Sequence, residues 1–415
     1  MTSSNAETPS LRKLRAFLFL PRNAWILTST SALWSVGSAM ANPYQTLYFA
    51  ALGASDFDIG LLVAFGTGVT VLALLLGGYV ADTWGRRRVI VIFSWVSVAS
   101  ALIYAAIDSP YLIVVPITIG SLASMYTPAF NAVMFDSIEP GDRIRGFSVF
   151  SAINTIPSIF TPTAGGLLMA HYGILHGVKI CYLASALFGA IGISIRQKLL
   201  GETFQVKAQQ KKSFFSFVKE SFVSGIDATR KSHKIVKQLL LYITLAGVGT
   251  GLTAPYASIY VVDHLKFNPI AYSFIVDLAG LTTVSLLLGV VFLIKRLGAK
   301  NGVLIASIAA PVSNVMFSQA KTMDELLEWG VTGAVGTAIQ SPSLSTMQAE
   351  MIEQENRGKI LAMFSILPAL VSLPSQVVAG FLYSSVAPVV PFIAAVVPFT
   401  IAAIVLFRIK GSKED

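Results

Sequence analysis

Residues 42–48 of the chain read NPYQTLY, and residues 254–260 read APYASIY. The proline and both tyrosines of the first stretch recur in the second, 212 positions further along a chain of 415 residues. The same offset joins the sequence LLLG at 74–77 to LLLG at 286–289. Ordered matches at nearly one offset are not expected by chance, so the chain is predicted to consist of two similar halves with the same orientation.

The composition is that of a membrane protein. Hydrophobic residues make up 54% of the chain and charged residues only 12%, whereas a soluble domain carries about 25% charged residues. Apolar runs recur along the chain, and about 20 residues suffice for a helix to cross a bilayer. The runs are too long and too continuously apolar for the strands of a membrane barrel. We therefore expect an all-α protein that spans the membrane many times.

Twelve transmembrane helices are predicted, in two parallel six-helix bundles joined by the longest polar stretch. The predicted domains are the N-terminal bundle 1–196, the cytoplasmic linker 197–237 and the C-terminal bundle 238–415. The expected spans are 24–49, 58–82, 88–107, 110–136, 145–170, 176–196, 238–262, 270–294, 300–319, 325–350, 358–383 and 387–407.

Positive charge predicts the orientation. If both termini lie on one side, all but three of the 30 Lys and Arg residues fall on that side, the exceptions being Lys179, Lys266 and Lys321. Because cytoplasmic loops collect Lys and Arg, both termini are expected to be cytoplasmic. The basic residues are spread over separate loops, so no nucleic-acid partner is expected.

The linker contains the sequence KKSFFSFVKESFVSGI at 211–226. Phe214, Val218 and Phe222 recur every four residues, which predicts an amphipathic helix on the cytoplasmic membrane face. The alternative is a helix that caps the two bundles.

The loop after the second expected span reads GGYVADTWGRRR at 77–88. This sequence resembles the signature of the major facilitator superfamily, although Thr83 stands where that family usually has a basic residue. A weaker second copy, KRLGAK, occupies 295–300. The resemblance covers the whole chain and implies the twelve-helix fold of that family. The residues that match the signature are Gly78, Asp82, Gly85, Arg86 and Arg87.

These residues are expected to form a conformational latch. Gly78 would let its helix pack closely, and the resemblance implies that Asp82 binds the helix start near Gly358. Arg86 or Arg87 could pair with a carboxylate at the end of the fourth span. The alternative is a loop that is positive only for topology. The other expected latch residues are Asp136, Glu139, Arg143, Glu353 and Arg357.

The fifth expected span contains TPTAGG at 161–166. Pro162, Gly165 and Gly166 resemble the end of the motif found in drug-proton antiporters, while Thr161 departs from it. Those antiporters usually carry an arginine early in the fourth helix, where this chain has Pro116. The resemblance to an efflux protein is therefore incomplete.

Asp277 is the one acidic residue of the 21 that is expected well inside a span. A carboxylate within a membrane is costly, and burial disfavours its charged form. Asp277 could therefore take up and release a proton, as proton coupling requires. The alternatives are a solvated carboxylate at the cavity mouth and a hydrogen bond to a neighbouring helix.

Polar residues in the helices that line the cavity in this family are candidates for substrate contact. No Lys or Arg is expected to project into the cavity, which disfavours phosphate, sulfate and dicarboxylate substrates. Amides within membranes more often join helices than bind ligands, and tyrosines near the surface are often interfacial. The candidates are Asn42, Tyr44, Gln45, Tyr126, Asn131, Asn154, Tyr256, Gln340 and Gln376.

The sequence predicts a secondary active transporter in the cell membrane that moves small neutral, lipophilic or cationic solutes by alternating access. Proton coupling is expected, and the resemblance to drug-proton antiporters makes efflux one of the two directions in which the solute could move. The alternatives are a solute receptor on a transporter fold and a sugar or metabolite uptake carrier or facilitator. No enzymatic activity, metal or cofactor is expected. The expected partners are a small-molecule substrate, the proton and the lipid bilayer, with a monomeric chain.

Overall fold

The computed structural model describes residues 20–139, 142–203, 214–352 and 357–408. These residues form α-helices with short 3-10 and π segments, and no strand occurs among them. The elements of the first half are α2 (Arg22–Ala41), η1 (Asn42–Tyr44), α3 (Gln45–Ala51), α4 (Asp56–Trp84), α5 (Arg86–Ala106), η2 (Pro110–Ile113), α6 (Val114–Ala123), α7 (Tyr126–Ser137) and α8 (Arg143–Leu199).

Helix α8 contains two antiparallel parts. Gly173 has φ 79° and ψ 160°, a conformation that a helix cannot contain and that glycine adopts easily. Beyond it the chain folds back on itself. The two parts pack closely there, as a side chain on Gly177 would lie only 2.6 Å from the Cα of Met169. The fifth and sixth expected spans are therefore a tight hairpin.

The second half repeats the order of the first. Helix α2 begins at Arg22 and α10 at Lys234, 212 positions later, and both have 20 residues. Both end just before the proline of the duplicated stretch. The remaining elements are the linker helix α9 (Phe214–Lys231), α10 (Lys234–Thr253), α11 (Ala257–Ile259), the π segment η4 (Tyr260–His264), α12 (Pro269–Leu297), α13 (Ala299–Gln319), α14 (Met323–Met351), α15 (Arg357–Ser385) and α16 (Val390–Phe407).

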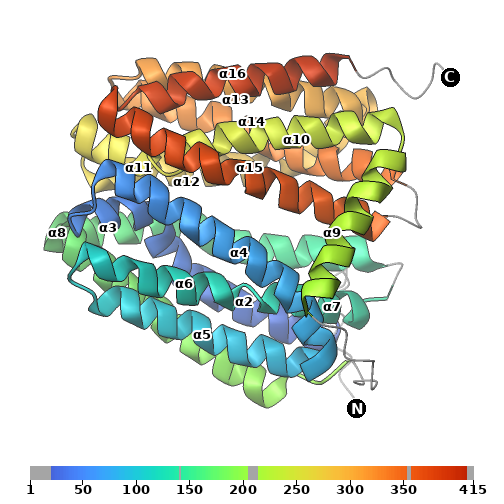
Figure 1. Cartoon of the computed structure of the whole chain (residues 1–415). Coiled ribbons are helices and arrows are strands. Elements are labelled where there is room, and N and C mark those ends of the chain that lie inside the picture. Colours follow the sequence, from blue (N-terminus) through green and yellow to red (C-terminus); the bar gives the residue numbers. More distant parts are fainter. Residues whose placement is uncertain (1–19, 140–141, 204–213, 353–356, 409–415) are drawn as a thin grey trace, which may run out of the picture.

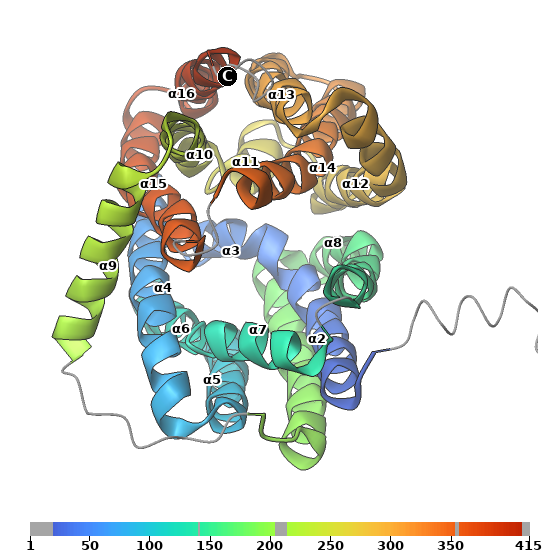
Figure 2. The same ribbon diagram turned by 90° about the vertical axis from the view of Figure 1, so that its right-hand side faces the viewer.

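The helices lie side by side in two groups, one from each half of the chain (Figures 1 and 2). The groups meet where α4 contacts α15, where α8 contacts α12, and where α3 contacts α11. The end of the bundle at which α2 begins and α16 ends is termed the inner end, and the opposite end is termed the outer end (Figure 1). Helix α9 crosses the inner end and packs on α15, with Gly225 against Met363, and also contacts α4 and α10.

Nine helical segments of the described chain are long and apolar enough to cross a membrane. One of them, Gly146–Leu199, contains the hairpin of α8. Helices α2 and α14 are not among the nine, because serines and threonines interrupt α2 and acidic and amide residues interrupt α14. The count of twelve crossings stays a prediction.

Candidate functional site

A cavity of about 1160 Å³ lies between the two groups of helices. Its walls come from α3, α4, α6, α7 and α15 of the described chain, with Tyr104 from α5. It runs from Gln45 and Phe49 to Phe135 and Leu361, which lie within about one turn of the inner ends of α7 and α15. The cavity therefore extends to the inner end of the bundle.

Two smaller cavities share walls with the large one. A cavity of about 350 Å³ within the first half shares Thr127 and Asn131 with it. A cavity of about 500 Å³ in the second half shares Leu361, Ser365 and Ala369. The three spaces are thus neighbouring parts of one central site.

Five of the predicted contact residues line these cavities. Gln45 donates to the hydroxyl of Tyr104 at 3.2 Å, and Gln340 donates to the hydroxyl of Tyr242 at 2.7 Å. These amides therefore also join helices, as the alternative interpretation expected. The five residues are Gln45, Tyr126, Asn131, Asn154 and Gln340.

The other four candidates are not on the walls of these three cavities. Tyr44 and Tyr256 are 0% exposed, because their rings are packed into the outer core. The Gln376 side chain is buried and accepts a hydrogen bond from Thr67 at 3.2 Å. Asn42 is exposed and does not line any of the three spaces.

The duplicated stretch joins the two halves at the outer end. The hydroxyls of Thr46 and Ser258, which are equivalent residues of the repeat, lie 3.1 Å apart. The Tyr256 hydroxyl donates to the backbone carbonyl of Asp56 at 2.7 Å. A side chain on Gly60 would lie 2.5 Å from the carbonyl oxygen of Gln376, so α4 and α15 are in close contact there.

These cross-half contacts, together with the close packing of Gly60 on Gly380, where a Cβ on Gly60 would lie 3.0 Å from the Cα of Gly380, are termed the outer closure. The aromatic rings behind them are fully buried. The protein is therefore closed at its outer end, while its cavity extends to the inner end.

Asp277 faces the other half of the molecule. It accepts a hydrogen bond from Thr163 of α8, and the Thr163 hydroxyl also lies 3.4 Å from that of Ser273. The second carboxylate oxygen of Asp277 is buried and has no hydrogen-bond partner in the described chain. The one predicted intramembrane carboxylate thus lies at the contact between α8 and α12.

The residues of the fifth-span motif surround this contact. The carbonyl of Pro162 accepts a hydrogen bond from the Tyr44 hydroxyl at 3.0 Å. Gly165 lies against α2, where a Cβ on it would overlap the carbonyl oxygen of Met40. Gly166 lies against α12, where a Cβ on it would be 2.8 Å from the hydroxyl oxygen of Ser273. The two glycines let α8 approach one helix of each half, and any larger side chain would separate them.

Arg196 corrects the expectation that no cation projects into the cavity. Sequence reasoning counted it with the positive charges of the cytoplasmic side, but it is 5% exposed and lines the 350 Å³ cavity. Its guanidinium donates to the hydroxyls of Thr30 at 2.7 Å, Ser31 at 2.7 Å and Ser94 at 3.1 Å. The argument against anionic substrates therefore no longer holds.

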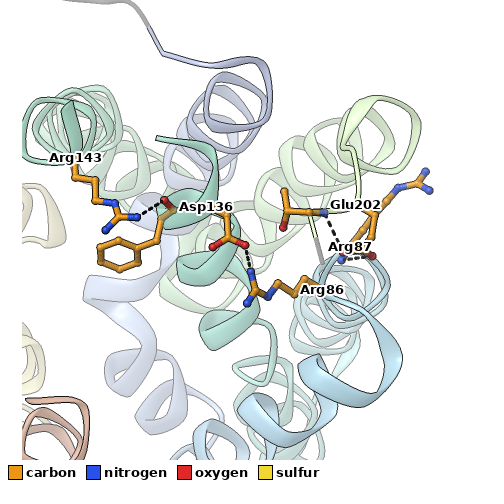
Figure 3. Close-up of polar contacts among 7 residues, drawn as sticks. Arg86, Arg87, Asp136, Arg143 and Glu202 are labelled. Atoms are coloured by element: carbon orange, nitrogen blue, oxygen red, sulfur yellow. Dashed lines mark hydrogen bonds and ion pairs between the residues drawn. The ribbon is translucent and has the colours of Figure 1, made fainter. Parts of the chain in front are cut away.

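The signature loop joins α4 to α5 at the inner end (Figure 1), and its polar contacts are drawn in Figure 3. Gly85 separates α4 from α5 with φ 89°, a value that favours glycine. Arg86 forms an ion pair with Asp136 at the end of α7. Arg87 instead donates to the carbonyl of Gln197 at 2.7 Å, and Arg143 donates to that of Phe135 at 3.3 Å. The loop therefore joins α5 to α7 and α8 within the first half.

Among the latch residues whose side chains the structure describes, Asp82, Glu139 and Gly78 make no cross-half contact. Asp82 is exposed, without a hydrogen bond or ion pair to the described residues, and the Glu139 side chain is also exposed. Nothing lies within 4 Å of a Cβ built on Gly78, whereas a Cβ built on Gly77 would overlap the backbone of Met125. The expected close packing thus belongs to the neighbouring glycine. Glu353 and the side chain of Arg357 lie outside the described residues.

The cavity lies between two groups of membrane helices and reaches one end of the bundle. This arrangement is that of a membrane transporter. The family comparison agrees. The model of the Major Facilitator Superfamily matches residues 27–238 and 239–415, so the chain belongs to this superfamily. It is a multi-pass integral membrane protein, and members of the family are transporters rather than enzymes.

Known proteins resemble this chain at low to moderate identity. The MFS-type transporter YqjV of Bacillus subtilis (strain 168) is 21% identical over 326 residues, which are 76% of this chain and 75% of that protein. A Na(+), Li(+), K(+)/H(+) antiporter of Planococcus maritimus is 32% identical over 142 residues, 32% of each protein. The crystal structure of the nucleoside transporter NupG has a TM-score of 0.74 at 17% identity, over 93% of this chain and 99% of that chain, which shows the fold alone.

Proposed function

We propose that this protein is a secondary active transporter that moves small organic solutes by alternating access, with both termini in the cytoplasm and twelve crossings. The predicted bundles 1–196 and 238–415 would rock against each other about the central cavity. The observation that carries this proposal is the asymmetry of the cavity. It extends to the inner end, while equivalent residues of the two repeats, Thr46 and Ser258, meet across the outer end.

The inner-end motif would act when the cavity changes sides. Asp82 is exposed and lies near the inner end of α4, the helix that contacts α15. In the outward-open state, this carboxylate is positioned to reach the N-terminus of α15, where the helix dipole favours an anion. The ion pair of Arg86 with Asp136 keeps the loop fixed to α7. The latch would thus stabilise the state opposite to the one described here.

Asp277 would couple transport to a proton. Its contact with Thr163 joins the two halves between α8 and α12, so separating these helices at the outer end would break it. Protonation changes the charge and the hydrogen-bonding capacity of the carboxyl group. It would therefore change the free-energy difference between the two conformations, which is the requirement for coupling. The name of the antiporter from Planococcus maritimus supports a role for protons in a related protein.

The test uses purified protein in proteoliposomes that contain a pH-sensitive dye. Solutes from four classes are supplied in turn: aromatic carboxylates, lipophilic cations, nucleosides and sugars. We expect one class to change the internal pH and to show counterflow of the labelled solute. Asp277→Asn should abolish the pH change, and the control Asp324→Asn, at an exposed carboxylate of α14, should not.

The outcomes separate the candidate functions. Binding without counterflow in any class would favour the receptor and contradict the transporter. Counterflow with no pH change in the wild type would favour a facilitator. A pH change that persists in Asp277→Asn would show that the proton is carried by another group.

A further inference from the structure

Arg196 is a buried cation without a buried anion. None of the described carboxylates forms an ion pair with its guanidinium, which is only 5% exposed. Its hydrogen bonds go to three neutral hydroxyls, and the Phe130 ring lies 5.6 Å from its Cζ. Burying a charge is costly unless an opposite charge or several strong hydrogen bonds compensate it.

The three hydroxyls orient the guanidinium but do not use all of its N–H donors. Thr30 donates its own hydrogen to the carbonyl of Ile26 at 2.6 Å, so its lone pairs face Arg196. A guanidinium carries five N–H donors. The three hydrogen bonds use one donor on each nitrogen, which leaves one on Nη1 and one on Nη2. Two donors on adjacent nitrogens are what a single carboxylate group can accept.

The space next to Arg196 fits a small organic acid. The cavity has a volume of about 350 Å³ and adjoins the large cavity through the walls at Thr127 and Asn131. Aromatic rings form much of its wall, and Asn131 and Asn154 also line it. The Asn154 amide donates to the carbonyl of Phe150 at 2.8 Å and accepts from Ser35 at 3.4 Å. The aromatic side chains are those of Trp34, Tyr126, Phe130 and Phe150.

We propose that Arg196 binds the carboxylate of a small organic monoanion whose apolar body rests against these rings. This inference rests on the proposed function, since it names the substrate class of the same central site. One guanidinium with two remaining donors suits one carboxylate. A phosphate or dicarboxylate would need a second cation, and no other Lys or Arg lines the three described cavities.

The first test compares three probes of similar shape and different charge: benzoate, benzamide and benzylammonium. Binding to the full chain in lipid nanodiscs is measured by calorimetry. We expect benzoate to bind at least tenfold more tightly than benzamide, and benzylammonium not to bind. Arg196→Gln should remove the preference for benzoate, and Lys198→Gln, an exposed charge on the same helix, should leave it unchanged.

A second variant keeps the proposal testable if Arg196→Gln does not fold. Arg196→Lys keeps the positive charge but loses the two-donor geometry, so benzoate affinity should fall about tenfold while the preference over benzamide remains. Equal affinity of the wild type for benzoate and benzamide would overturn the inference, as would an Arg196→Gln variant that binds benzoate normally. Benzoate binding that depends on Arg196 without counterflow would support the anion site and contradict the transporter.

Discussion

Gly60 is the position where one added methyl group should open the outer closure. Its Cβ would lie 2.5 Å from the carbonyl oxygen of Gln376 and 3.0 Å from the Cα of Gly380. Ordinary contact begins at 3.4 Å, so Gly60→Ala requires α4 and α15 to separate by about 0.9 Å at this point. Both neighbours are backbone atoms, which cannot move aside by changing a rotamer.

The cost follows from the overlap. Inserting a methyl group into a packed contact costs about 1–3 kcal/mol. The cost falls on the outward-closed state alone if α4 and α15 separate when the outer end opens. The ratio of outward-open to outward-closed molecules should therefore rise by roughly 5- to 150-fold.

The assay measures the distance between spin labels by pulsed electron resonance. Labels are placed at Ala51 and Ser385, two exposed residues near the outer end, in a background where the single, buried Cys181 is replaced by alanine. Gly60→Ala should add or strengthen a longer-distance population. The control is Gly68→Ala on the same helix, whose Cβ would meet Leu373 at an ordinary 3.7 Å. If both variants have the distance distribution of the parent protein, the Gly60 contact does not hold the outer end closed.

Two further predictions concern the fifth-span motif. Tyr44→Phe should lower the free energy of unfolding by about 1 kcal/mol, because it removes the hydrogen bond to the buried carbonyl of Pro162. Unfolding in detergent mixtures measures this loss. The control Tyr111→Phe, at a ring that is 89% exposed, should leave the free energy of unfolding unchanged. Gly165→Ala should cost about 1–3 kcal/mol, because its Cβ would lie 2.4 Å from a carbonyl oxygen of α2. Gly289→Ala, where nothing lies within 4 Å, should melt like the wild type, and equal melting temperatures for both glycine variants would contradict the close packing.

Much of the fold could be predicted because it depends on repeated local patterns. The offset of 212 in the sequence reappears in the starts of α2 and α10, and the duplicated prolines break both helices. Asp277 could be singled out from hydropathy alone. Its contact with Thr163 could not be predicted, because the pairing of α8 with α12 arises only from the packing of two distant segments.

The positions of Arg196 and of the duplicated tyrosines could not be predicted from the sequence, for two physical reasons. Arg196 lies in the last turn of α8, and a charge count assigns such a residue to the adjoining loop. Side chains on a helix point towards its N-terminus, which here directs the guanidinium into the bundle. Tyr44 and Tyr48 are four residues apart, as are Tyr256 and Tyr260, so each pair shares a helix face, but this spacing does not tell which neighbour covers that face.

The most direct test of the account is a reversible crosslink across the outer closure. The hydroxyls of Thr46 and Ser258 lie 3.1 Å apart, so cysteines at both positions should be able to form a disulfide. With a solute that shows counterflow in the parent protein, we predict that oxidation of Thr46→Cys/Ser258→Cys abolishes counterflow and that reduction restores it, while each single variant remains active. Full counterflow in a completely crosslinked sample would show that this end does not need to open, and would contradict alternating access through the central cavity.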